Sequence, residues 1–124
     1  MVNKYNYNES LQSFIEYSNP SRWKIFETLK VNGQNDKQFG EIKCSKSEFN
    51  YFVNNHSYPL KVVENNEVIL GSYLLIDALG RLFEDSQGKH TYSSKLQNNS
   101  VEKCLSEINL NRENFIKKGG IYKW

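Results

Sequence analysis

The sequence predicts an α/β fold: a single domain over residues 1–124, with a small mixed sheet of three or four strands and three main helices. Length is the first observation, because 124 residues suffice for one modest core. The second is the apolar run Tyr73–Ile76, closed by Asp77, which has the length of a strand buried on both faces. The third is that segments with helical spacing of apolar residues lie on both sides of it. We therefore expect the sheet to be centred on residues 72–77.

Capping and breaking residues predict the elements at the start of the chain. Asn8 is expected to cap a helix over residues 9–17, with an apolar face of Leu11, Phe14 and Ile15. Asn19–Pro20 should end this helix. An alternating strand is expected over residues 23–31, followed by a loop over residues 32–36.

Similar signals predict the elements around the expected central strand. Ser45 or Ser47 should cap a helix with a buried stripe of Phe49, Phe52 and Val53. The other expected elements are a strand at residues 60–63, a polar turn at 64–67, a turn at 78–81 leading to a short strand at 82–83, a surface turn at 84–89 and a returning strand at 90–93.

Two helices are expected after the last strand. Ser100 should cap a helix that carries Val101, Cys104, Leu105 and Ile108 on one face. A short helix over residues 112–117 should end at Gly119–Gly120.

Composition excludes several classes of site. The formal charge of +2 is too small to indicate nucleic-acid binding by itself, and no apolar run is long enough for a membrane span or a signal region, so the cytoplasm is expected. Cys44 and Cys104 are far apart, and with only His56 and His90 beside them no zinc or iron–sulfur spacing exists; we expect no cofactor. Neither histidine has a serine, cysteine or carboxylate at a sequence spacing that is typical of a catalytic site, which argues against a hydrolytic site.

Three clusters carry a resemblance to a known family over nearly the whole chain. They are residues 19–26 (NPSRWKIF) followed by Gly33-Gln34-Asn35, residues 71–77 (GSYLLID) with Gly80-Arg81, and residues 115–124 (FIKKGGIYKW). In order and interval they resemble the C-terminal part of viperin, the radical S-adenosylmethionine (SAM) nucleotide dehydratase of antiviral defence, and its prokaryotic relatives. The resemblance implies that the chain forms the last part of a partial barrel and its C-terminal extension.

The motifs that perform the family's chemistry do not occur in this sequence. The family holds a four-iron cluster on Cys-x-x-x-Cys-x-x-Cys and binds SAM on a glycine-rich loop, and neither motif is present. Because such a cluster needs three cysteine thiolates, we expect that this chain by itself is not an enzyme.

The resemblance implies a set of nucleotide-binding residues. In the family, the residues that correspond to Arg22 and Lys24 hold the triphosphate of CTP, and a C-terminal segment with an aromatic residue at the position of Tyr122 folds over the nucleotide. Arg22 and Lys24 lie two residues apart on an expected strand, so both side chains should point to one face. Spacing alone favours exposed charges at a strand end, and the resemblance brings the two interpretations near parity.

Two classes of function follow. The first is a stand-alone, non-catalytic interaction module and anti-defence inhibitor, an anti-CRISPR protein directed at a type VI RNA-targeting effector with its guide RNA. Small size, an Asn- and Lys-rich composition, Met1 and an apparently complete C-terminus favour it. Its expected partner-binding residues are Lys117, Lys118, Tyr122, Lys123 and Trp124. The alternative is the CTP-binding C-terminal lobe of a viperin-like dehydratase that makes 3′-deoxy-3′,4′-didehydro nucleotides.

An exposed sheet edge is expected to demand a partner protein or a dimer. We place this edge at Trp23–Leu29, because a piece of a larger barrel would leave one strand and some apolar surface uncovered. The stand-alone interpretation and the lobe interpretation both require that this surface be covered.

Overall fold

A computed structural model describes residues 1–119 and residue 121. The chain divides into two compact units: residues 1–30 with 36–66, and residues 31–35 with the chain from Glu67 onward. The α/β class is confirmed, because helices and strands are interspersed along the described chain. The strands form two small sheets instead of the single sheet expected from the sequence, one with two strands and one with three. That the chain is a single domain stays a prediction.

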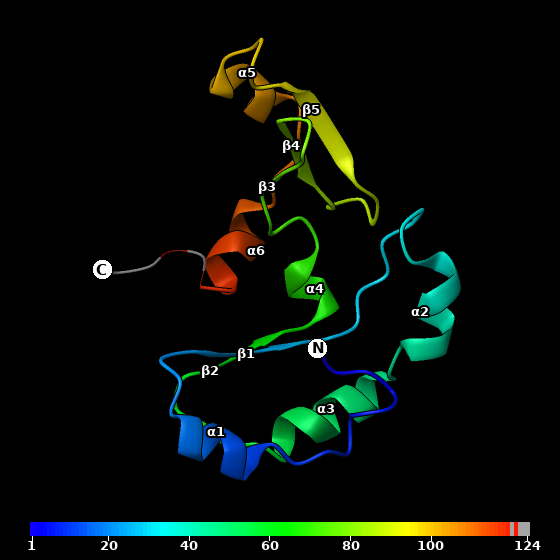
Figure 1. Cartoon of the computed structure of the whole chain (residues 1–124), viewed down its shortest axis with the longest axis vertical. Coiled ribbons are helices and arrows are strands. Elements are labelled where there is room, and N and C mark those ends of the chain that lie inside the picture. Colours follow the sequence, from blue (N-terminus) through cyan, green and yellow to red (C-terminus); the bar gives the residue numbers. More distant parts are fainter. Residues whose placement is uncertain (120, 122–124) are drawn as a thin grey trace. The chain divides into compact units, whose positions relative to one another are not determined.

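The first unit contains a parallel pair of strands with helices to one side (Figure 1). In chain order its elements are α1 (Gln12–Ser18), β1 (Trp23–Phe26), α2 (Asp36–Ile42), α3 (Lys46–Asn54) and β2 (Lys61–Glu64). The register aligns Trp23 with Lys61 and Phe26 with Glu64.

A capping box starts α3 and orients its buried face. The Ser45 hydroxyl accepts a hydrogen bond from the backbone amide of Glu48 at 3.2 Å, and the Glu48 carboxylate accepts one from the Ser45 amide at 2.6 Å. Of the two serines considered from the sequence, Ser45 is therefore the cap. Phe49 and Phe52 on α3 pack with Ile25 of β1 in the core of this unit.

The first helix begins later than the sequence predicts. Asn8 is not its cap, because residues 4–8 form a turn in which the Tyr7 amide bonds to the Asn3 carbonyl at 3.1 Å. The N-cap position belongs to Leu11, whose amide donates to Nε2 of the buried His56 at 2.8 Å. Only Ile15 of the expected apolar face is buried, since packing against His56 determines the orientation of the helix.

The predicted strand over residues 23–31 is shorter than expected, and it is not a bare edge. It ends at Phe26, after which Glu27 forms a single parallel bridge with Val2. The Thr28 hydroxyl then donates to the Val2 carbonyl at 2.6 Å. Strand β1 therefore lies between β2 and the backbone at Val2. The edge predicted at residues 23–29 is therefore covered in part, at residues 26–28, while β1 remains a strand of a two-stranded sheet.

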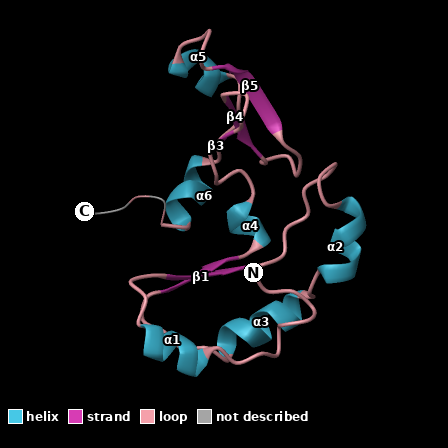
Figure 2. Cartoon of the chain, in the orientation of Figure 1, coloured by secondary structure: helices cyan, strands magenta, loops and turns pink. Residues whose placement is uncertain are grey.

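The second unit contains an antiparallel sheet with strand order β3-β4-β5 (Figure 2). Its elements are α4 (Asn66–Ile69, beginning at the boundary between the units), β3 (Leu75–Ile76), β4 (Arg81–Glu84), β5 (Thr91–Lys95), α5 (Val101–Ser106) and α6 (Arg112–Lys117). Ser100 caps α5 as predicted, but only Cys104 of its expected apolar face is buried. No helix in the described part of the chain is both long enough and apolar enough to cross a membrane.

The apolar run over residues 73–76 is not the central strand. Only Leu75 and Ile76 pair, they occupy an edge of the sheet, and their side chains are 45% and 63% exposed. Strand β4 is central, with Leu82 and Glu84 buried. A continuous apolar run does not distinguish a buried strand from an apolar surface, and here the turn that begins at Asp77 ends the pairing after two residues.

Gly71 fixes the entry into the second sheet. Its φ of +66° belongs to the left-handed region, and its amide donates to Oδ1 of Asp85 at 2.9 Å. Its carbonyl accepts a hydrogen bond from the amide of Asn111 at 2.8 Å. A Cβ atom at this position would lie 2.7 Å from Cβ of Ser86. The position therefore requires glycine both for its backbone angle and for the space around it.

We predict that Gly71→Ala destabilises the protein more than Gly80→Ala. Both glycines have positive φ, but a Cβ at Gly80 meets nothing within 4 Å. Gly80→Ala should cost about 1 kcal/mol of unfolding free energy from backbone strain alone. Gly71→Ala should cost at least about 2 kcal/mol, because a clash is added to the strain. Urea denaturation of both variants measures the difference, and equal losses would contradict the close packing at Gly71.

Candidate functional site

The two basic residues predicted to bind phosphate lie at the start of the parallel pair. Lys24 is the second residue of β1, and Arg22 immediately precedes the strand. Both side chains are partly buried. Lys24 aligns with Val62 of β2, and side chains that alternate along β1 place Lys24 and Phe26 on one face. The core residue Ile25 points to the other face, toward α3. Lys24 therefore lies on the side of the strand pair that faces away from the hydrophobic core of this unit.

A buried carboxylate holds the ammonium group of Lys24. Nζ of Lys24 lies 2.7 Å from Oε1 of Glu64, whose side chain is 0% exposed. Glu64 aligns with Phe26 in the parallel register, so Lys24 and Glu64 are on neighbouring strands and share a face. A phosphate at Lys24 would share this ammonium with Glu64.

Sequence reasoning missed Glu64 because it assigned residues 64–67 to a polar turn. The signal was present: Glu64 continues the alternation of Val62 in the predicted strand over residues 60–63. A charged residue at the inward position at the end of a short apolar strand indicates a buried partner.

The pocket beside β1 is small. It has a volume of about 100 Å³, and its lining includes Glu9, Trp23, Lys24 and Phe52. Pockets that enclose drug-sized ligands usually measure ~300–1,000 Å³. This pocket cannot enclose a nucleoside triphosphate, and its lining includes Lys24 but not Arg22.

The predicted C-terminal residues fall into two groups. Tyr122, Lys123 and Trp124 lie outside the described residues. Lys117 is exposed at the end of α6, with Nζ 4.0 Å from a carboxylate oxygen of Glu113. Lys118 is only 5% exposed, and its Nζ lies 3.0 Å from the centroid of the Tyr73 ring. Within the second unit, this cation–π contact holds the end of α6 against Tyr73, which lies just before β3. The predicted partner contacts of these residues stay predictions.

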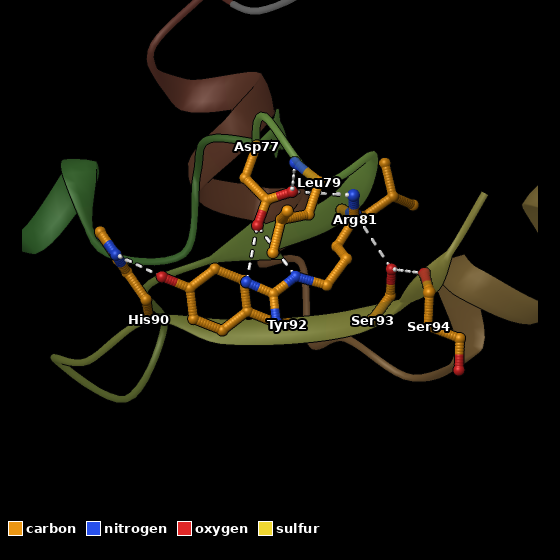
Figure 3. Close-up of polar contacts among 8 residues, drawn as sticks. Asp77, Leu79, Arg81, His90, Tyr92, Ser93 and Ser94 are labelled. Atoms are coloured by element: carbon orange, nitrogen blue, oxygen red, sulfur yellow. Dashed lines mark hydrogen bonds and ion pairs between the residues drawn. The ribbon is translucent and has the colours of Figure 1, made fainter. Parts of the chain in front are cut away.

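The turn between β3 and β4 is held by an aspartate and an arginine (Figure 3). Oδ1 of Asp77 accepts the amides of Leu79 at 2.9 Å and Arg81 at 3.0 Å, while Oδ2 accepts Nη2 of Arg81 at 2.7 Å. The Arg81 amide lowers the pKa of the Asp77 carboxyl, and the hydrogen bond from the guanidinium lowers it further. Asp77 and Arg81 therefore form a salt bridge within this turn.

The two histidines have different environments. His56 is buried, with Nε2 accepting the Leu11 amide and Nδ1 lying 2.7 Å from the Phe52 carbonyl. The carbonyl can only accept, so Nδ1 carries the proton and His56 has a structural role. His90 is partly exposed, and its Nδ1 lies 3.3 Å from the Tyr92 hydroxyl. His56 lies in the loop that follows α3, and it is buried because α3 and Leu11 enclose it.

The cysteines do not fit an iron–sulfur cluster. Cys44 belongs to the first unit, where burial raises the pKa of its thiol and the nearby carboxylate of Glu27 raises it further. Cys104 is fully buried in the second unit, and its thiol donates to the Ser94 carbonyl at 3.3 Å. Within residues 1–119 and 121, no group of three or more His, Cys, Asp and Glu side chains could hold a metal ion.

Proteins with similar sequences are named as S-adenosylmethionine-dependent nucleotide dehydratases. The chain is 35% identical over its whole length to an S-adenosylmethionine-dependent nucleotide dehydratase from Lacinutrix mariniflava, and 38% identical to one from Flammeovirga pacifica. It is also 28% identical over its whole length to one from Oncorhynchus mykiss. No family model matches the chain.

The chain is homologous to the C-terminal part of the viperin-like nucleotide dehydratases. It spans 26% of the Lacinutrix dehydratase, 43% of the Flammeovirga dehydratase and 37% of the Oncorhynchus dehydratase. The resemblance predicted from the three sequence clusters is therefore confirmed. The rest of each dehydratase, more than half of its length, has no counterpart in the 124 residues.

We predict that Asp77→Asn lowers the melting temperature at neutral pH and that this difference closes in acid. The folded-state pKa of Asp77 is lowered, so its contribution is fully present above the unfolded-state value. The contribution is lost as the pH falls from about 3.9, the ordinary aspartate value, through the folded-state value. Calorimetry across this range on parent and variant makes the measurement.

The control for this prediction is Asp36→Asn, which changes an exposed pair with Lys30 at 3.5 Å. Exposed pairs contribute little, so this variant should melt close to the parent at every pH. A difference for Asp77→Asn that does not depend on pH would contradict the role given to its charge.

Proposed function

We propose that this chain is the nucleotide-binding C-terminal lobe of a viperin-like, SAM-dependent nucleotide dehydratase, and that it binds the phosphates of CTP. The observation that carries the proposal is the similarity of the whole chain to two bacterial enzymes of that name, at 35% and 38% identity. The placement of Arg22 and Lys24 at the start of β1, both partly buried, supports it.

The chemistry of the two residues suits a polyphosphate. Arginine presents a planar set of donors that matches two phosphate oxygens, and lysine supplies a compact positive charge. Glu64 keeps the Lys24 ammonium in one place, so less side-chain entropy is lost when phosphate binds. The same carboxylate repels phosphate, so the affinity of this lobe alone should be modest.

The radical step belongs, in this proposal, to a part of the enzyme outside these 124 residues. The chain has two cysteines, fewer than the three thiolates that the cluster needs. The chain would contribute phosphate binding, while cluster, SAM and the formation of 3′-deoxy-3′,4′-didehydro nucleotides would depend on the remainder. The interpretation as an inhibitor of a CRISPR effector gains no support from the structure or from the similar sequences, and it stays a prediction.

We predict that Arg22→Ala weakens CTP binding by about ten- to a hundredfold, because one charge-assisted contact to phosphate contributes ~1.5–3 kcal/mol. Isothermal titration calorimetry at fixed salt is the measurement. Lys43→Ala, which removes an exposed lysine from the same unit, is the matched control and should leave the affinity unchanged. Tight CTP binding that survives Arg22→Ala would refute the assigned site.

Lys24 needs a different substitution, because Lys24→Ala would leave the buried carboxylate of Glu64 without this ammonium. Removing one partner of a buried pair costs about 3–5 kcal/mol and would confuse unfolding with lost binding. The double variant Lys24→Met/Glu64→Gln removes both charges and keeps the volume. We expect it to fold, as judged by circular dichroism, and to bind CTP as weakly as Arg22→Ala does.

The DNA immediately upstream of Met1 gives an independent test of the proposal. We expect an in-frame region that encodes Cys-x-x-x-Cys-x-x-Cys, either continuous with this chain or in a neighbouring gene. A stop codon and a ribosome-binding site directly before Met1, with no such region nearby, would favour the independent interaction protein.

A further inference from the structure

A second pocket lies in the second unit, apart from the residues assigned to phosphate. It has a volume of about 90 Å³ and is lined by Tyr73, Leu75, Phe83, Glu84, Asp85 and His90. Register places Leu75 opposite Phe83, and Phe83 opposite Tyr92, so these side chains form a row across the three strands. Three of the lining residues are aromatic, and two carry carboxylates. Neither the similarity to the dehydratases nor the proposed function assigns a role to this pocket.

Both carboxylates sit at the end of β4, next to the aromatic residues. Glu84 is only 2% exposed, and its Oε2 accepts a hydrogen bond from the Ser86 amide. Asp85 accepts the Gly71 amide on Oδ1. Among residues 1–119 and 121, no lysine, arginine or histidine forms an ion pair with either carboxylate. A buried carboxylate is stabilised by a cation that neutralises it, so this end of the pocket favours positive charge.

Two aromatic rings of this unit, one of them that of the lining residue Tyr73, already attract cations. Nζ of Lys118 lies 3.0 Å from the centroid of the Tyr73 ring, and the Arg81 guanidinium carbon lies 4.2 Å from the centroid of the Tyr92 ring. The ring faces carry negative charge density, which is the origin of the attraction. The Phe83 and His90 rings lie 5.0 Å apart at 60°, and both line the pocket.

We propose that this pocket binds a methylated ammonium group. Aromatic rings with an adjacent carboxylate are the combination that recognises quaternary ammonium, whose charge cannot be satisfied by hydrogen bonds. The size agrees: an apolar cavity of ~150 Å³ holds benzene, so the 90 Å³ here suits a smaller group such as trimethylammonium. Phosphate is excluded from the same place by the two carboxylates, which separates this site from the one at Arg22 and Lys24.

The test is a titration of the whole chain with choline, followed by NMR of the aromatic ring protons. The matched ligand is 3,3-dimethylbutan-1-ol, in which carbon replaces the charged nitrogen at nearly the same volume. We expect choline to shift the Tyr73, Phe83 and His90 resonances in a saturable way and the neutral alcohol to bind at least about threefold more weakly. Equal binding of the two would show an apolar pocket only, and absence of saturable binding by choline would also overturn the proposal.

Substitutions of lining residues test whether choline binds in this pocket. Phe83→Leu and Asp85→Asn should each lower the affinity for choline about threefold to thirtyfold, the range of a partly desolvated cation–π contact. Asp85→Asn keeps the oxygen that accepts the Gly71 amide, so the fold should survive. Tyr17→Leu and Glu113→Gln remove an exposed ring and an exposed carboxylate elsewhere and should leave the affinity unchanged. Unchanged choline binding by a folded Phe83→Leu variant would refute the assignment.

Methylated ammonium groups occur both on free metabolites and on modified side chains of proteins. A short peptide containing trimethyllysine, compared with the same peptide containing lysine, distinguishes the sources. Stronger binding of the methylated peptide than of choline indicates a protein ligand, and the reverse order indicates a small molecule. Equal failure of choline and of both peptides contradicts the site itself. CTP binding is measured on the same samples and reports on Arg22 and Lys24 separately.

Discussion

The ion pair between Lys24 and Glu64 is the interaction on which the candidate phosphate site depends. It joins the two parallel strands of the first unit on the face opposite the core residue Ile25. A carboxylate that is 0% exposed needs a cation close by, so Lys24 cannot move far toward solvent. The pair therefore fixes the ammonium group at one point and also limits how strongly that point attracts phosphate.

This arrangement explains why the lobe is expected to bind nucleotide incompletely. The pocket beside β1 is about 100 Å³, too small for a nucleoside triphosphate, so under the proposed function the contacts to base and ribose would come from outside it. The dehydratases to which the chain is homologous are more than twice its length. The pocket in the second unit has the opposite electrostatic character, with two carboxylates among aromatic rings, and is suited to a cation. The two units therefore offer chemically distinct surfaces.

Local signals predicted most element positions, and packing decided which residues became buried. Ser45, Ser100 and the turn closed by Asp77 and Arg81 were predictable, because capping and turn formation depend on neighbours in the sequence. Burial was harder to predict. Leu75 and Ile76 were expected at the centre of a sheet but lie exposed at an edge, since an apolar run does not reveal which strands will pair beside it. Glu64 was expected in a polar turn because it is charged, but it is the buried last residue of β2.

The sequence by itself determined the α/β class and the homology to the dehydratases, because each depends on residue types at short intervals. Through that resemblance it also suggested Arg22 and Lys24 as phosphate ligands, which stays a prediction. Only the tertiary structure decided that Glu64 pairs with Lys24, that Lys118 lies on the ring of Tyr73, and that carboxylates and aromatic rings line one pocket. Glu64 is 40 positions from Lys24, and Lys118 is 45 positions from Tyr73. Contacts over such separations are set by strand register and by the burial of charge, which no local pattern records.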